Sequence, residues 1–254
     1  MRNIIAIADK ELRSYFASPI AYIIIGLFAL VFGYFFDIYV AYFLRSSMQM
    51  QFGGGGNMNV NQVVIGNALQ NAAVIILFMM PMITMRTYSE EKRSGTIELL
   101  LTSPVTDFQI IVGKFLGALG VYIATLAVTV LYVALLFWYG NPEWRPIVAG
   151  YLGLILMGAS FVAWGLFWSS VTKNQIVAAF LTFVFFLMLW VISWIGDSSG
   201  PTAQAITSYL SITEHLGDFT KGVIDTKHVV YYLSFITFGL FLTAKSVDSE
   251  RWRG

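Results

Sequence analysis

Long apolar stretches separated by short polar segments dominate the pattern of the chain. A bilayer core of about 30 Å requires about 20 apolar residues in helical form, because lipid cannot satisfy the backbone hydrogen bonds of an open chain. Six stretches meet this requirement and are expected to be transmembrane helices: residues 20–43, 66–85, 110–138, 147–170, 176–195 and 229–244. The sequence therefore predicts an all-α integral membrane protein in which residues 1–254 form a single transmembrane domain.

The first 18 residues are less apolar and amphipathic. Apolar residues recur there at helical spacing, and Asp9, Lys10 and Arg13 occupy the opposite face. We expect this segment to form a helix that lies in the membrane interface. Ser18 followed by Pro19 is a typical N-cap and first-turn pair, so the first span should begin there.

Positively charged residues are distributed unevenly between the two sets of loops. Eleven are assigned to one side: Arg2, Lys10, Arg13, Arg86, Lys92, Arg93, Lys114, Lys173, Lys245, Arg251 and Arg253. Four are assigned to the other side: Arg45, Arg145, Lys221 and Lys227. Because Lys and Arg next to the spans are retained in the cytoplasm, both termini are expected to be cytoplasmic, in a protein of the inner (plasma) membrane.

The composition limits the functions that the chain is expected to perform. Apolar residues make up 57% of the chain and charged residues 11%, against about 25% charged in a soluble domain. The net charge of +1 offers no basic stripe for nucleic acid. Cysteine is absent, and His215 and His228 fall within or beside the external stretch 197–227. We therefore expect no enzymatic activity, no catalytic residue, no metal site and no cofactor on this chain.

Two segments are expected on the external side. Residues 45–65 include four consecutive glycines from Gly53 to Gly56, which predicts a flexible connector. Residues 197–227 are longer and carry apolar residues at helical spacing. They predict a short helical element packed on the outer mouth of the spans.

The cytoplasmic stretch 86–106, between the second and third spans, concentrates signals for helix ends. Thr87 and Glu90 have the spacing of a capping box, and Gly95 suits a left-handed helix end. Thr96 can then begin a second short helix that runs to Leu101. This pattern predicts a short, folded helical hairpin.

The end of this stretch also contains signals for the start of a helix. Pro104 after Ser103, and Thr106 three residues before Gln109, are start signals for the third span. A rigid element bonded to two spans, with Ile97 and nearby leucines on one face, is suited to dock in the groove of another protein. An ordinary interfacial turn whose charges prefer water explains the same residues, and both interpretations stay open at this point.

The residues of this stretch resemble the signature loop of ABC-2 type permeases, the membrane subunits of one class of ATP-binding-cassette transporters. The likeness rests on these residues: Glu90, Glu91, Lys92, Arg93, Gly95, Thr96, Glu98, Leu99, Leu100 and Pro104. The interfacial helix, the six spans and the external segment also fall where that family has them. Within the family, the sequence most resembles the gliding-motility-associated permeases, with the permease of the nitrous-oxide-reductase copper-maturation transporter a near relation.

This resemblance implies a short cytoplasmic coupling helix that contacts a separate ATPase subunit, where ATP and Mg are bound. It assigns these residues to the contact: Glu90, Glu91, Arg93, Gly95, Thr96, Glu98, Leu100 and Leu101. It also implies a second permease subunit, identical or related. No ATP site is expected on this chain, because the one Gly-Lys pair, Gly113-Lys114, precedes Phe115 and lacks the earlier glycine of a phosphate-binding loop.

Alternative functions would depend on other residues. An ion-driven carrier is less favoured, because Asp37 is the one ionisable residue assigned to the interior of the spans. Three external methionines, Met48, Met50 and Met58, suit Cu(I), so a copper contact is a hypothesis. The short external segment after the first span departs from the drug-exporter branch, which often carries a large domain there. The main alternative function is a membrane anchor that passes ATPase-driven movement to a partner protein without transport.

Overall fold

The computed structural model describes residues 2–53, 59–98, 105–197 and 200–251. Its elements are α1 (Arg2–Ala17), α2 (Pro19–Gly53), the π-helix η1 (Asn61–Gly66), α3 (Asn67–Thr84), α4 (Arg86–Ser94), α6 (Asp107–Tyr139), α7 (Trp144–Val171), α8 (Gln175–Asp197), α9 (Pro201–Leu210), α10 (Glu214–Thr220) and α11 (Thr226–Arg251). Within the described residues, six helices are long and apolar enough to cross a membrane, and all of the regular structure is helical. The predicted fold class is confirmed.

The core of the bundle is organised around α7, which packs against α3, α6, α8, α10 and α11. The sequence of α7 is apolar on all sides, as expected for a helix surrounded by other helices. Trp164 stacks on Phe185 of α8, with ring centroids 4.4 Å apart, and also contacts Phe235 of α11. Since lipid offers no hydrophobic drive for helices to associate, such shape-matched packing holds the spans together.

The N-terminal helix α1 packs across α6. Gly113, Gly117 and Gly120 form a stripe on α6, and side chains of α1 lie directly against it. A side chain at these glycines would overlap Ile7, Glu11 or Leu12, respectively. The amphipathic segment is therefore attached to the third span through a stripe of small residues.

Three segments differ from the expectation. Residues 45–53 continue the first span as helix, and Asn61–Gly66 forms a π-helix, so the predicted flexible connector 45–65 is wrong over these residues. The last helix extends well beyond 229–244, and residues 197–227 contain two helices, α9 and α10, instead of one. Hydropathy marks the thickness of the bilayer, but a helix continues into water until a breaking residue or an unfavourable contact ends it.

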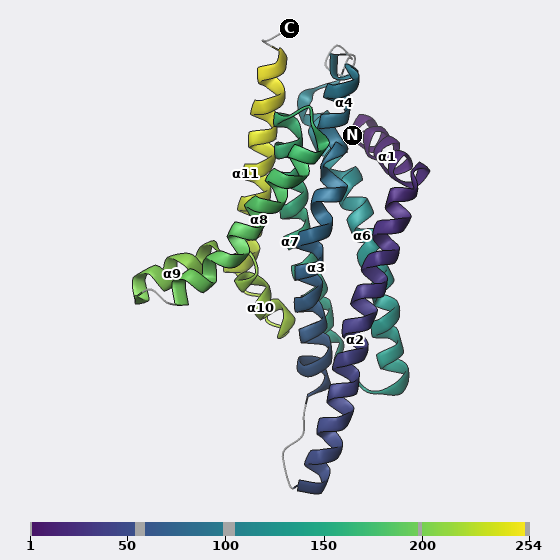
Figure 1. Ribbon diagram of the computed structural model, residues 1–254, viewed down its shortest axis with the longest axis vertical. Helices are drawn as coiled ribbons and strands as arrows, with labels where there is room; N and C mark the ends of the chain where they lie inside the picture. Colours follow the sequence, from purple (N-terminus) through teal and green to yellow (C-terminus); the bar gives the residue numbers. More distant parts are fainter. Residues whose placement is uncertain (1, 54–58, 99–104, 198–199, 252–254) are drawn as a thin grey trace.

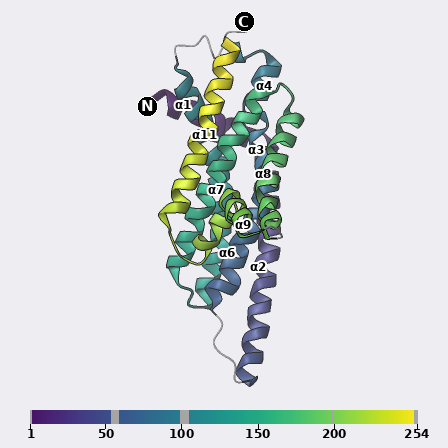
Figure 2. The ribbon, with the colours of Figure 1, turned by 90° about the vertical axis from the view of Figure 1, so that its left-hand side faces the viewer.

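Both termini lie at the same end of the bundle as α4, which we call the α4 end (Figure 1). The view turned by 90° shows the same arrangement, with α2 extending farthest at the opposite end, which we call the far end (Figure 2). An even number of spans requires termini on one side. The cytoplasmic position of the α4 end stays a prediction from the distribution of Lys and Arg.

Candidate coupling site at the α4 end

Helix α4 continues almost directly from α3. Met85, the single residue between them, has helical backbone angles (φ −54°, ψ −36°), and its N–H donates to the carbonyl oxygen of Pro81 at 2.9 Å. The predicted capping box of Thr87 and Glu90 is wrong, because α4 already begins at Arg86 and the Thr87 hydroxyl donates to the Thr84 carbonyl instead. Helices α3 and α4 therefore form one nearly continuous helical segment.

The junction between α3 and α4 is held by Ser169 of α7. Its buried hydroxyl accepts from the backbone N–H groups of Tyr88 and Ser89, at 3.0 and 3.1 Å, and donates to the Met85 carbonyl at 2.8 Å. A hydroxyl inserted into a helical ladder in this way fixes the local direction of the helix. The orientation of α4 is thus set by the fourth span as well as the second.

Replacing Ser169 by alanine is expected to lower the free energy of unfolding by about 1–2 kcal/mol, because three buried hydrogen bonds are lost. Ser170→Ala is the matched control: this neighbour is also fully buried, but its hydroxyl donates to Phe167 of its own helix. We expect less than about 1 kcal/mol there. Equilibrium unfolding in mixed micelles compares the two, and equal losses would contradict the role given to Ser169.

A buried lysine connects α4 to two other helices. Lys114 of α6 donates to Glu11 of α1 at 2.9 Å, to Glu91 of α4 at 2.8 Å and to the carbonyl of Thr87 at 2.9 Å. Its side chain is 1% exposed and lies 5.0 Å from the centre of the Tyr88 ring. Charges this far from water are retained only when they are paired, so Lys114 fixes the relative positions of α1, α4 and α6.

Two further contacts fasten the same region. The Tyr15 hydroxyl of α1 donates to the Ile83 carbonyl at 2.6 Å, and the Arg86 guanidinium lies 4.3 Å from the centre of the Tyr15 ring. Burial raises the pKa of Tyr15, which keeps this hydroxyl protonated as a donor. Lys92, 2% exposed, pairs with Glu250 of α11 at 2.5 Å. Helix α4 is therefore tied to α1, α6, α7 and α11.

The predicted contact residues separate into two groups. Exposed residues are Glu90, Arg93, Gly95, Thr96 and Glu98, and we call the four with side chains, Glu90, Arg93, Thr96 and Glu98, the docking face. Glu91 points inward to Lys114, while Leu100 and Leu101 lie outside the described residues. The left-handed helix end at Gly95 is confirmed by its φ of +73°, and the predicted cap at Thr106 by its hydrogen bond to the Gln109 N–H.

The apolar side of the loop is not presented for docking as expected. Ile97 is 8% exposed and belongs to the core. Among the described residues, the exposed surface of α4 and of the residues that follow it is charged and polar.

Comparison with known proteins identifies the family. The family model described as "ABC-2 family transporter protein" matches residues 45–213. The chain belongs to the ABC-2 transporter family. The "Probable multidrug ABC transporter permease YbhR" of Escherichia coli strain K12, and its counterpart in strain O157:H7, are each 27% identical over 153 residues. These alignments cover 59% of this chain and 41% of the relatives, so the matched region spans less than half of their length.

The match clarifies which parts of this ABC-2 protein belong to the shared unit. Residues 45–213 include α4, the docking face and Ser169, whereas α1 and α11 lie outside them. Glu11 and Glu250, which pair with the buried lysines of the site, are thus contributed by flanking helices.

Several residues of the site were missed by the sequence interpretation of this ABC-2 protein. Lys114 was counted as a flanking cation, although it lies within the predicted third span and is buried in α6. A lysine inside a span requires a partner, and that signal was available in the sequence. Glu11 and Ser169 carry no comparable signal, because their partners are 103 and 80 or more residues away in the chain.

Proposed function

We propose that this chain is the permease subunit of an ABC transporter of the inner membrane, with both termini in the cytoplasm. It moves a substrate with energy from ATP, which a separate cytoplasmic ATPase hydrolyses with Mg while bound to the docking face. The observation that carries this proposal is the continuity with the second span of α4, which presents the charged and exposed Glu90 and Arg93. Membership of the ABC-2 family supports it.

Coupling requires that force applied to α4 reaches several spans together. Lys114, Ser169 and Lys92 join α4 to α6, α7 and α11, respectively, and Glu11 brings α1 into the same body. Since buried and paired groups resist separation, the α4 end would move as one rigid unit when the ATPase closes on ATP. The spans below it would then change their tilt.

The finer features of the function are part of the same proposal. A second permease subunit, identical or related, would complete the path, since six helices enclose a large cargo poorly. For the physiological role we favour gliding motility, on the resemblance of the loop sequence, over the multidrug transport named for the Escherichia coli relatives. Residues 54–60 alone connect α2 to η1, which leaves little chain for an external domain at that position.

Reversing the charges of the docking face should release the ATPase. We expect Glu90→Lys combined with Arg93→Glu to weaken co-purification of the ATPase at least about tenfold, because like charges across an interface cost several kcal/mol. Glu91 is unsuitable for this test, since a second cation beside Lys114 would disrupt the fold itself.

The matched control reverses an exposed pair at the far end, with Glu143→Lys and Arg145→Glu. Both double variants should insert normally and elute as folded protein, and only the first should lose the ATPase. If the docking-face variant retains the ATPase and its substrate-stimulated turnover in proteoliposomes, the proposed site is wrong. Stimulation by a protein partner alone would favour the membrane-anchor alternative.

A further inference from the structure

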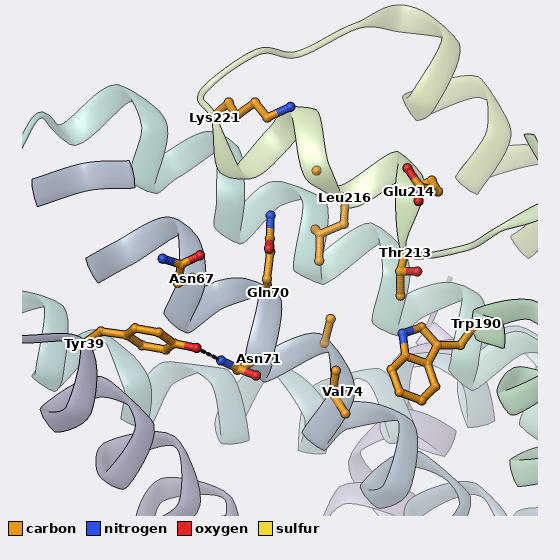
Figure 3. A pocket seen from close by; sticks show the side chains of 12 residues that line it. Tyr39, Asn67, Gln70, Asn71, Val74, Trp190, Thr213, Glu214, Leu216 and Lys221 are labelled. Carbon is orange, nitrogen blue, oxygen red and sulfur yellow. Dashed lines mark hydrogen bonds between the residues drawn. The ribbon is translucent and has the colours of Figure 1, made fainter. Parts of the chain in front are cut away.

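A polar cavity of about 500 Å³ lies between α2, α3, α8 and α10 (Figure 3). Three amide side chains, Asn67, Gln70 and Asn71, form one face of α3 toward it. Helix α10 forms the roof, with Glu214 and Lys221 at its two ends (Figure 3). Amides on a membrane-spanning helix are costly in lipid, and α10 covers one side of the cavity that they line.

Helix α10 is fastened by a chain of hydrogen bonds, which we call the histidine clasp and define as His215, Asp218 and His228. The two Nδ1 atoms of His215 and His228 are 2.6 Å apart, and His228 Nε2 lies 2.9 Å from Asp218 Oδ2. His215 Nε2 lies 2.9 Å from the carbonyl oxygen of Tyr209, at the end of α9. Both imidazoles are buried, so water does not substitute readily for these bonds.

Counting hydrogens shows that the clasp requires one additional proton. Its three links each need one hydrogen: Tyr209 oxygen to His215, His215 to His228, and His228 to Asp218. Two neutral imidazoles supply one each, and an ionised carboxylate supplies none. Without a third proton, one link must bring two lone pairs together.

The neighbouring groups determine which side chain of the clasp would carry the third proton. The Tyr209 carbonyl can only accept, so His215 carries hydrogen on Nε2 and presents a bare Nδ1. Burial lowers the pKa of His215, which keeps it neutral, and the hydrogen bond from His228 lowers the pKa of Asp218, which keeps it ionised. To fill both remaining links, His228 would have to direct one N–H toward each neighbour.

Other titratable groups around the clasp are few. Tyr209 faces the clasp from α9. Lys221, which follows α10, pairs with Asp218, and the distance between Lys221 Nζ and Asp218 Oδ1 is 3.6 Å. Lys227 is the residue before His228 in the sequence. Tyr231 and Tyr232 of α11 pack on the His215 ring, and Asp225 pairs with Lys227 at the surface. From α7 the glycine at position 153 faces α10, which adds no charge.

We propose that the histidine clasp is a binding site for a single proton, and that this proton holds α10 in its place beside the polar cavity and so limits access to it. Loss of the proton leaves two bare nitrogens facing each other, whereas a second proton places two N–H groups face to face. Either change breaks the link between His215 and His228, so that of the clasp only the His228–Asp218 hydrogen bond still joins α10 to α11. The inference concerns the far end and holds whatever protein binds the docking face.

The absence of cysteine allows a direct test of cavity access. In proteoliposomes, Val74→Cys places a thiol in the cavity wall, and Asn141→Cys places one on the exposed loop of the far end. The ratio of their modification rates by a membrane-impermeant methanethiosulfonate removes the part of the pH dependence that the two thiols share. We expect this ratio to be lowest near neutral pH and to rise at least about threefold toward both pH 9 and pH 5.

The Asp218→Asn variant tests whether the additional proton is needed, because it can keep all three hydrogen bonds of the clasp without that proton. The amide can donate to His228 Nε2, so all three links are filled by neutral groups and the ratio should stay low up to pH 9. Asp225→Asn, a nearby exposed carboxylate outside the clasp, should keep the wild-type rise. His228→Asn, which removes the central ring, should give a high ratio at every pH. A flat ratio in the wild type, or an unchanged alkaline rise in Asp218→Asn, would overturn the proposal.

Discussion

Replacing Lys114 by methionine is expected to lower the free energy of unfolding by about 3–5 kcal/mol, because two buried carboxylates lose their shared cation. Glu11 and Glu91 keep only 12% and 16% of their side chains exposed, so water cannot solvate them in place. One oxygen of Glu91 is already buried without a hydrogen-bond partner among the described residues. Equilibrium unfolding in mixed micelles would measure the loss.

Two further variants separate this interpretation from a general sensitivity of the α4 end. Lys10→Met removes a cation that is 66% exposed and 3.7 Å from Glu91, and should cost less than about 1 kcal/mol. Adding Glu11→Gln and Glu91→Gln to Lys114→Met removes the unpaired charges and should recover most of the stability. A single Lys114→Met variant as stable as the wild type would show that the cluster does not hold the three helices.

The spans were predictable because lipid imposes a single, strong requirement on them. A length of apolar sequence identifies each helix, and Gly95 and Thr106 mark the ends of helices by local chemistry that the structure reproduces. The resemblance of the same loop predicted the ABC-2 family, and the family match over residues 45–213 confirms it. These features depend on neighbouring residues, which a sequence displays directly.

The connections of the site depend on distant residues and were not predictable in the same way. Helix α4 begins without the expected cap because Ser169 of another span supplies the hydrogen bonds. The inward position of Glu91 follows from Lys114, and the pairing of His215 with His228 follows from the placement of α10 against α11. In each case the partner is selected by tertiary packing, which periodicity does not encode.

The contact between α6 and α7 provides the second large effect. Gly158 lies directly against the ring of Tyr122, and an added methyl group would overlap the ring carbons. Tyr122 cannot move aside easily, because it is fully buried and its hydroxyl donates to the Leu154 carbonyl at 2.7 Å. Gly158→Ala is therefore expected to lower the free energy of unfolding by about 3 kcal/mol, at the upper end for overpacked cores.

Gly26→Ala is the matched control, since an added methyl group on this span meets nothing within 4 Å and should change the free energy of unfolding by less than about 1 kcal/mol. Unfolding in mixed micelles would compare the two variants. Equal stability would mean that α6 and α7 separate at little cost. Lys114 joins α4 to α6, and Ser169 joins α4 to α7. In that case, a movement of α4 could shift α6 and α7 relative to each other instead of moving them together.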